Sequence, residues 1–279
     1  MKNLNTTLKT FLFSILLFLS HTVCAQNQDS ITFCKADWNT KNIKKGIVWK
    51  QKNFSNLFSS HQEINIIEIN LKKHIKNLNL AALDKKKQKT SVLAQEHNAL
   101  LAVNGGFFDM KNGGAVDYIK VNNQIYYKSI TKSARANGFL AFDDKKITIT
   151  DDSTRVKDFA NAIQSGPLLI LNNNKQIFPK NAFNDNRHPR TAVAIKGNTL
   201  LLITVDGRNS NAEGMNLPEL SSILQWYGAN NALNLDGGGS TAMYIYGQPE
   251  NGIVNYPSDN KTFDHKGERS VSNIIYLKK

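Results

Sequence analysis

The stretch "TAVAIKGNTLLLITVDG", residues 191–207, decides the fold class of this chain. Two apolar runs flank the pair Gly197-Asn198, and a two-residue connection of this composition is typical of a tight antiparallel hairpin. Closing the hairpin at this turn places Arg190 opposite Val205. Arg190 and Asp206 are therefore expected at the same end of the hairpin.

The hairpin leads into a predicted strand, helix and second strand. Residues 218–227 carry apolar side chains at helical spacing and are followed by Gly228, and the strand "ALNL" at residues 232–235 comes next. Such a unit is normally parallel, which places Asp206 and Asp236 at one edge of the sheet. If the two strands are neighbours, about 4.8 Å apart, their carboxylates fall within the roughly 5–10 Å separation of paired-acid glycosidases.

The remainder of the chain reads mainly as short strands bounded by Gly, Asn or Asp. With 279 residues and 41% hydrophobic content, the chain can bury a large core. We predict a single α+β domain with a mixed, mainly antiparallel β-sheet core and a few helices, one of them over residues 90–96. Residues 26–60 are expected to form a polar lead-in, and residues 61–279 the main domain.

The N-terminus has the pattern of a secretory signal peptide over residues 1–25. Lys2 and Lys9 precede the apolar run "FLFSILLFL", and "VCA" supplies small residues for cleavage before Gln26. This run is shorter than the roughly 20 residues that span a bilayer, so we expect an exported, periplasmic or extracellular protein with no transmembrane segment after cleavage. A lipid anchor at Cys24 is the less favoured alternative.

Charge and cysteine content narrow the choice of partners. The whole chain has a formal net charge of +13, which favours acidic partners. The sequence lacks the basic stripe interleaved with aromatic residues that is typical of nucleic-acid binding, so we do not expect nucleic acid as a partner. After cleavage Cys34 is the one remaining cysteine, and a single thiol forms no intramolecular disulfide. The stability of the fold is therefore expected to come from its hydrophobic core and not from a disulfide.

The segment "DGGGST" at residues 236–241 allows two interpretations. Asp followed by Gly is a common turn, so Asp206 and Asp236 could each cap a loop. Alternatively, the three glycines could form a nest of backbone N–H groups for an anion, with hydroxyl donors from Ser240 and Thr241. Two Asp-Gly turns at one sheet edge, with Arg190 expected there too, bring the two interpretations close to balance.

Several segments together resemble the phosphodiester glycosidase family, which includes bacterial exported proteins and the mannose 6-phosphate uncovering enzyme. The resemblance runs in order from about residue 100 to residue 277. It rests on these segments: "AVNGGFFD", "AIQSGPLLI", "RHPRTAVAI", "LLITVDGRNSNAEGMNLPELSSILQWYGANNALNLDGGGSTAMY" and "ERSVSNIIYL".

This resemblance implies an exported hydrolase that cleaves the glycosidic bond of sugar-1-phosphodiesters, on envelope or extracellular glycans. Its partner would be a phosphorylated sugar or glycan, and Asp236 and Asp206 would be the catalytic residues. The segments that match the family motifs would bind substrate and phosphate through Asn104, Gly105, Asp109, Gln164, Ser165, Arg190, Arg208, Gly237, Gly238, Gly239, Ser240, Thr241 and Arg269. In this interpretation, the glycines let the phosphate approach the backbone.

Two other functions are left open by the sequence. One is a metal-assisted phosphodiesterase that cuts the P–O bond, with Asp109, Asp206 and Asp236 as hard oxygen ligands. The other is a non-catalytic glycan-binding surface protein. The sequence itself requires no cofactor, although it leaves room for a divalent metal.

Overall fold

The computed structural model describes residues 28–131 and 133–279, so the predicted signal peptide lies outside the described residues. The chain divides into one unit that ends at Ala36 and a second that spans Asp37–Lys279. The first contains the helix α2 (Gln28–Cys34), and Cys34 is a free, exposed cysteine. All further description concerns the second unit.

The second unit is built from four antiparallel sheets. The largest has eight strands in the order β1 (Asn39–Lys44), β2 (Ile47–Phe54), β3 (Gln62–Asn70), β15 (Thr199–Val205), β14 (Arg190–Lys196), β16 (Asn231–Asn234), β12 (Leu168–Leu171) and β13 (Asn174–Lys175). The second has five, in the order β10 (Ile147–Thr150), β9 (Gly138–Phe142), β11 (Asn161–Ser165), β7 (Ile119–Val121) and β8 (Gln124–Tyr127). The third orders β17 (Met243–Ile245), β6 (Ala99–Asn104), β19 (Asn273–Lys278) and β4 (Leu78–Ala82), and the fourth pairs β18 (Ser270–Val271) with β5 (Gln88–Lys89).

The helices are short and lie between strands. They are α3 (Leu71–His74), α4 (Thr90–Glu96), α5 (Ala182–Asp185) and α6 (Leu217–Trp226), with 3-10 turns η1 (Ile75–Asn77), η2 (Gly238–Ser240) and η3 (Glu250–Gly252). This content confirms the predicted α+β class with a mainly antiparallel core. Among the described residues, no helix is both long and apolar enough to cross a membrane.

The predicted hairpin is confirmed in its register. Arg190 pairs with Val205 and Lys196 with Thr199 along β14 and β15. The helix that follows is α6, and Asn216 caps it in a reciprocal capping box, in which the side chains of Asn216 and Glu219 each bond the other's backbone N–H. The local turn and cap signals therefore determine this part of the fold.

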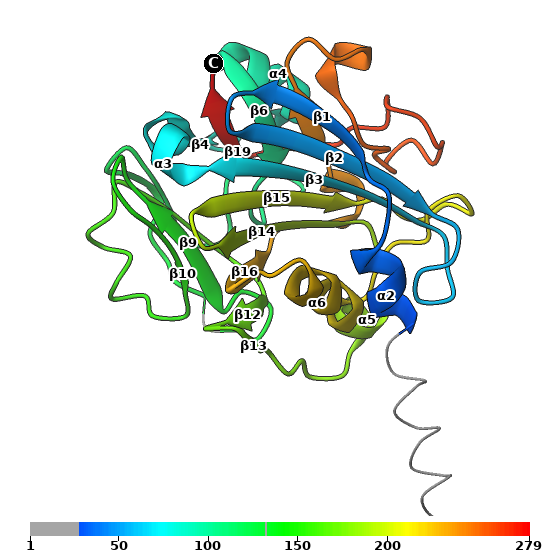
Figure 1. Cartoon of the computed structure of the whole chain (residues 1–279). Helices are drawn as coiled ribbons and strands as arrows, with labels where there is room; N and C mark the ends of the chain where they lie inside the picture. The colour runs from blue at the N-terminus through cyan, green and yellow to red at the C-terminus, as the bar shows by residue number, and fades with distance from the viewer. Residues whose placement is uncertain (1–27, 132) are drawn as a thin grey trace, which may run out of the picture. The chain divides into compact units, whose positions relative to one another are not determined.

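The strands that end at Asp206 and Asp236 are not neighbours, so the condition stated for a close pair of carboxylates is not met. β15 and β16 run parallel, as expected, but β14 lies between them and pairs with both. The other edge of β15 is taken by β3, which pairs with it from Thr199↔Asn70 to Val205↔Ile64 (Figure 1). The two strand ends are thus about 10 Å apart, which is twice the neighbour spacing.

The eight-stranded sheet begins earlier in the chain than the predicted domain start at residue 61. β1 and β2 are its first two strands, and β2 pairs with β3 along eight residues, from Ile47↔Ile69 to Phe54↔Gln62. Figure 1 shows β1, β2, β3 and β15 side by side, although β15 lies far along the sequence. The expected polar lead-in therefore contributes two strands to the compact unit that starts at Asp37.

The core lies between the large sheet and the five- and four-stranded sheets. Buried aliphatic side chains from all three sheets form one cluster, which includes Ile67, Leu101, Leu140, Leu202 and Leu233. α6 packs against β12 of the large sheet (Figure 1). The Ser221 hydroxyl of α6 donates to the carbonyl of Leu169 at 2.9 Å. Each Å² of apolar surface that these sheets bury stabilises the fold by about 25 cal/mol. This packing of the sheets against one another holds the strand ends in place.

Candidate functional site

The ends of β6, β14 and β16 meet at Asp236. The backbone N–H of Asp236 donates to the carbonyl of Gly105 at 2.9 Å, and the Asn104 amide donates to the carbonyl of Asp236 at 2.6 Å. The side-chain oxygen of Asn104 accepts from the Thr191 hydroxyl at 2.7 Å and from the backbone N–H of Ala242 at 3.1 Å. Asn104 is fully buried, so it is placed to position Asp236 and not to contact a ligand directly.

The Asp236 carboxyl group is partly buried among groups that oppose each other in their effect on its pKa. Burial raises this pKa to about 6, while the Ser240 hydroxyl, the positive charges of Arg135 and Arg269, and the backbone N–H of Gly237 hold it lower. The Ser240 hydroxyl is buried and has no hydrogen-bond partner among the described residues. A carboxyl group that titrates near neutral pH beside two arginines is suited to acid or base chemistry on an anionic substrate.

Arg135 is a site residue that the sequence interpretation missed. It is exposed, and its guanidinium stacks over the ring of Phe107 at 4.0 Å from the centroid and lies 5.5 Å from that of Phe183. Its loop carries no motif, so the one available signal was an isolated arginine in "KSARANG". Its importance comes from the fold, which brings it within electrostatic reach of Asp236.

Gln164, predicted to bind substrate, instead holds the loop that carries Arg135. Its side-chain nitrogen donates to the carbonyls of Thr131 and Ala136, both at 2.7 Å. Its oxygen accepts from the backbone N–H of Thr131 at 3.0 Å and from that of Tyr118 at 3.4 Å. With these four bonds made and the side chain buried, Gln164 positions Arg135 through the backbone of its loop.

Two predicted arginines lie beside the three glycines. The guanidinium of Arg208 approaches Gly238 so closely that an added Cβ would lie 2.9 Å from its Nη2. Arg208 itself has φ +64°, a left-handed backbone that is uncommon for residues with a side chain and costs on the order of 1 kcal/mol. Arg269 lies against Gly239 and is held by Asp259, whose Oδ1 accepts from its Nε at 3.0 Å and from its Nη2 at 2.5 Å.

The glycines therefore make room for the protein's own groups. A Cβ on Gly237 would lie 2.7 Å from the carbonyl oxygen of Pro189, and the N–H of Gly238 donates to that same oxygen at 2.8 Å. The N–H of Gly237 faces the Asp236 carboxylate at 3.1 Å, and those of Ser240 and Thr241 bond within the turn. The expected phosphate nest is thus largely occupied by internal hydrogen bonds. Of the two arginines beside the glycines, Arg208 is exposed, whereas Nε and Nη2 of Arg269 are bonded to Asp259.

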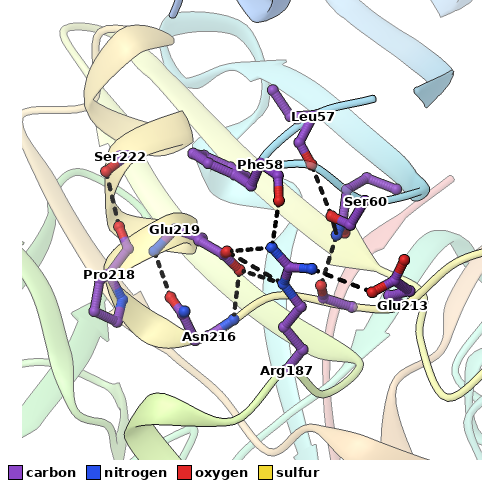
Figure 2. A network of polar contacts seen from close by, with 11 residues as sticks. Leu57, Phe58, Ser60, Arg187, Glu213, Asn216, Pro218, Glu219 and Ser222 are labelled. Carbon is purple, nitrogen blue, oxygen red and sulfur yellow. Dashed lines mark hydrogen bonds and ion pairs between the residues drawn. The ribbon is translucent and has the colours of Figure 1, made fainter. Parts of the chain in front are cut away.

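The segment "RHPR" at residues 187–190 runs between the two strand ends and is tied down by its first residue. Figure 2 shows that Arg187 contacts Glu219 on α6, Glu213 and the carbonyl of Phe58. Its Nη2 donates to Glu219 at 2.7 Å, and this pairing raises the pKa of Arg187. This network holds the backbone of residues 187–190, and Gly237 packs against the Pro189 carbonyl in that segment.

Arg190, which was predicted to hold phosphate, is buried and bonded to backbone carbonyls. Its Nε donates to Met215 at 2.8 Å, and its Nη2 donates to Phe183 at 2.7 Å and to Asn186 at 3.1 Å. Burial lowers its pKa to about 10, and Glu219 partly opposes this effect. Its arrangement is that of a residue that ties α5 to the hairpin, because the donors expected to hold a phosphate are taken by carbonyls.

Asp206 lies at the same edge of the large sheet but is fully buried. Its Oδ1 accepts from the Asn255 amide at 2.7 Å, and its Oδ2 has no hydrogen-bond partner among the described residues. Burial raises its pKa to about 7, the Asn255 amide and the N–H of Tyr256 lower it, and the nearby Glu63 raises it. At neutral pH a large fraction of this carboxyl group is therefore protonated.

The other predicted site residues have structural partners or are closed off from solvent. Asp109 accepts from the N–H groups of Asn112 at 3.0 Å and Lys111 at 2.7 Å, which lower its pKa. The hydroxyls of Ser165 and Thr241 are buried and unpaired among the described residues. The N–H of Gly105 donates to the carbonyl of Asn273 at 3.0 Å, and the Asn273 side chain fills the space that a Cβ there would need.

The metal-ligand set considered from the sequence is not assembled in the structure. Within residues 28–131 and 133–279, no group of three or more His, Cys, Asp or Glu side chains is placed to hold a metal ion. Asp109, Asp206 and Asp236 therefore do not converge on one point.

Comparison with known proteins agrees with the resemblance seen in the sequence. The sequence profile described as phosphodiester glycosidase matches residues 97–278, which is more than half of the chain. A prophage-derived protein of Bacillus subtilis, YomE, described as uncharacterized, is 25% identical over 172 residues. That match covers 58% of this chain but 26% of the relative, so the chain corresponds to about a quarter of that protein.

Solved structures with low sequence identity share the fold. A hypothetical protein from Synechocystis has a TM-score of 0.70 at 17% identity, and the match covers 87% of this chain and 64% of that one. The catalytic domain of zebrafish N-acetylglucosamine-1-phosphodiester alpha-N-acetylglucosaminidase has a TM-score of 0.64 at 19% identity, over 88% of this chain and 85% of that domain.

Proposed function

The chain belongs to the phosphodiester glycosidase family, and from this we propose that it is an exported hydrolase that cleaves the glycosidic bond of sugar-1-phosphodiesters. Its substrates would be phosphodiester-linked sugars of envelope or extracellular glycans. The observation that carries the proposal is the environment of Asp236, a partly buried carboxyl group with a pKa raised by burial to about 6 and with Arg135 and Arg269 beside it.

The arginines would bind the phosphodiester. Arg135, Arg208 and Arg269 approach Asp236 or its glycines from three different loops, and all three side chains are at least partly exposed. A guanidinium presents a planar set of N–H donors that matches phosphate oxygens. As the bond to the sugar breaks, negative charge accumulates on the departing phosphate, and these donors stabilise it.

Asp236 would act on the sugar. A phosphate monoester is a good leaving group, so little proton donation to it is needed, and the main demand is to stabilise an oxocarbenium-like centre and to direct water or a nucleophile to it. The ionised form of Asp236, which prevails above a pH of about 6, serves this purpose. We assign Asp236 as nucleophile or general base in its ionised form.

Asp206 takes a positioning role in this proposal. It has no solvent access, and a strand-end separation of about 10 Å lies at the upper limit of the roughly 5–10 Å between paired carboxyl groups. Its bond to Asn255 instead fixes the segment after β17, because Asn255 also accepts from the N–H of Met243 at 2.7 Å and donates to the carbonyl of Thr241 at 3.2 Å.

The proposal is tested by turnover of a panel of hexose- and N-acetylhexosamine-1-phosphodiesters. The purified protein should release free sugar and a phosphomonoester, and Asp236→Asn and Arg135→Ala should lose most of this activity while remaining folded. Arg155→Ala removes an arginine that is exposed elsewhere and should retain it. Binding of the panel without turnover would support the glycan-binding alternative, and full activity of Asp236→Asn would refute the assignment.

A further inference from the structure

A hollow of about 660 Å³ is lined in part by Asp109 and its loop, and Met110 of the same loop contacts Arg269. Its wall includes the turn at residues 83–85, the loop at residues 109–116, and Tyr126 and Tyr127 of the edge strand β8. The volume is within the range of about 300–1,000 Å³ that is usual for small-molecule sites. No part of the reaction proposed above uses this hollow.

The floor of the hollow is pre-formed by internal hydrogen bonds. The Ser272 hydroxyl donates to the carbonyl of Lys86 at 2.8 Å and accepts from the N–H of Gly114 at 2.9 Å, which links the two loops. A Cβ on Gly113 would lie 2.6 Å from the backbone of Lys86, so the absence of a side chain lets these loops touch. Asp109 closes its own loop through Asn112, which gives this predicted site residue a role in shaping the hollow.

The wall combines exposed aromatic rings with polar side chains. Tyr126 and Tyr127 are each 38% exposed, and the neighbouring Ile125 is 52% exposed. Asp84 and Asn112 are exposed polar groups on the opposite loops. A pyranose ring has apolar C–H faces and a rim of hydroxyls, so it can stack on an aromatic ring while it hydrogen-bonds to carboxylate and amide groups.

One residue contact links the loop that lines the hollow to the candidate site. Met110, in the loop of Asp109, places its sulfur 3.9 Å from Nη1 of Arg269, whose charge acts on Asp236. The loop that lines the hollow is therefore in contact with an arginine whose charge acts on Asp236.

We propose that this hollow is a subsite for a pyranose unit of the substrate beyond the scissile bond, with Tyr126 and Tyr127 as its stacking surface. This inference rests on the proposed function for its place in the reaction. It makes the protein an enzyme for extended glycans, since a small sugar-1-phosphodiester would leave the hollow empty.

The experiment measures binding and turnover separately. Binding is measured calorimetrically with neutral hexasaccharides of glucose, mannose and N-acetylglucosamine, using the full protein and Tyr126→Ala/Tyr127→Ala. Tyr246→Ala serves as the matched control, because Tyr246 is also exposed, at 53%, but lies outside the hollow. Hydroxyl-radical footprinting of the unmodified protein, with and without hexasaccharide, reports on the tyrosines without any substitution.

We expect at least one hexasaccharide to bind, with an affinity at least about tenfold lower in the double tyrosine variant and unchanged in Tyr246→Ala. The glycan should protect Tyr126 and Tyr127 from radicals. In turnover, the double variant should raise KM for an extended phosphodiester and leave a small one unaffected. If hexasaccharides bind at the tyrosines but no phosphodiester is hydrolysed, the subsite stands and the proposed function fails. The subsite is refuted if no hexasaccharide binds, or if binding and protection do not involve the two tyrosines.

Discussion

Replacing Asp206 by asparagine should change how stability depends on pH. Asp206 is fully buried, accepts one hydrogen bond from Asn255 at 2.7 Å and leaves its other oxygen unpaired among the described residues. Burial raises its pKa from 3.8 to about 7. At about 1.4 kcal/mol per pKa unit, the difference corresponds to about 4 kcal/mol between its protonation states.

The direction of the pH dependence follows from whether the folded or the unfolded chain binds the Asp206 proton more tightly. Below a pH of about 4, Asp206 is protonated in both the folded and the unfolded chain, and it imposes no penalty for charge burial. As the pH rises from 4 to 7, the unfolded chain releases the proton while the folded chain keeps it, so the free energy of unfolding falls. The amide that replaces this carboxyl group in Asp206→Asn does not titrate. The stability of the variant relative to the unmodified protein should therefore increase by about 4 kcal/mol between pH 4 and pH 8.

Urea unfolding of both proteins at a series of pH values measures this difference. Asp109→Asn is the matched control, because hydrogen bonds from Asn112 and Lys111 lower the pKa of Asp109 and its difference curve should slope in the opposite direction. A difference curve for Asp206 that is flat, or that falls as the pH rises, would refute the reasoning that this carboxyl group is held protonated by burial.

The remaining predictions concern the site. Asp236→Asn should lower kcat by about 100-fold or more. The kcat/KM of the unmodified enzyme should fall as the pH drops through about 6, the value to which burial raises the pKa of Asp236. A flat pH profile would contradict the role of the ionised carboxylate. Gly237→Ala should lower the free energy of unfolding by about 1–3 kcal/mol, because its Cβ would lie 2.7 Å from the carbonyl of Pro189; chemical denaturation measures this, and unchanged stability would contradict it. Gln164→Ala should lose activity because it releases the loop of Arg135. Gln164→Glu keeps an acceptor but no amide donor, so it should lose part of the activity. Steady-state kinetics on the folded variants measure these losses, and full activity of both variants would show that the loop does not need Gln164 as an anchor.

Local signals in the sequence were sufficient for the hairpin and for the helix after it. The Gly-Asn turn fixes the pairing of Arg190 with Val205, and the helix predicted over residues 218–227 corresponds to α6, which Asn216 and Glu219 cap. These features depend on residues that are close in sequence. The position of β16 depends instead on which edge of the hairpin is free. Because β3 pairs with the outer edge of β15, β16 pairs with β14.

The candidate site residues were chosen from the sequence because they follow strand ends, but the contacts that each one makes depend on long-range packing. Arg190 and Arg269 look alike in sequence, yet Arg190 is consumed by three carbonyls whereas Arg269 stays partly exposed beside Gly239. Arg135 has no motif at all and is brought to Asp236 by a loop that Gln164 anchors. No local pattern distinguishes these cases, because each is set by packing between segments far apart in the chain.

The most direct test of the account is hydrolysis of a sugar-1-phosphodiester in water labelled with ¹⁸O. If the enzyme is a glycosidase with Asp236 acting at the sugar, the label appears in the released sugar and not in the phosphomonoester. Label in the phosphate would show that the P–O bond is cut, and would contradict the central claim.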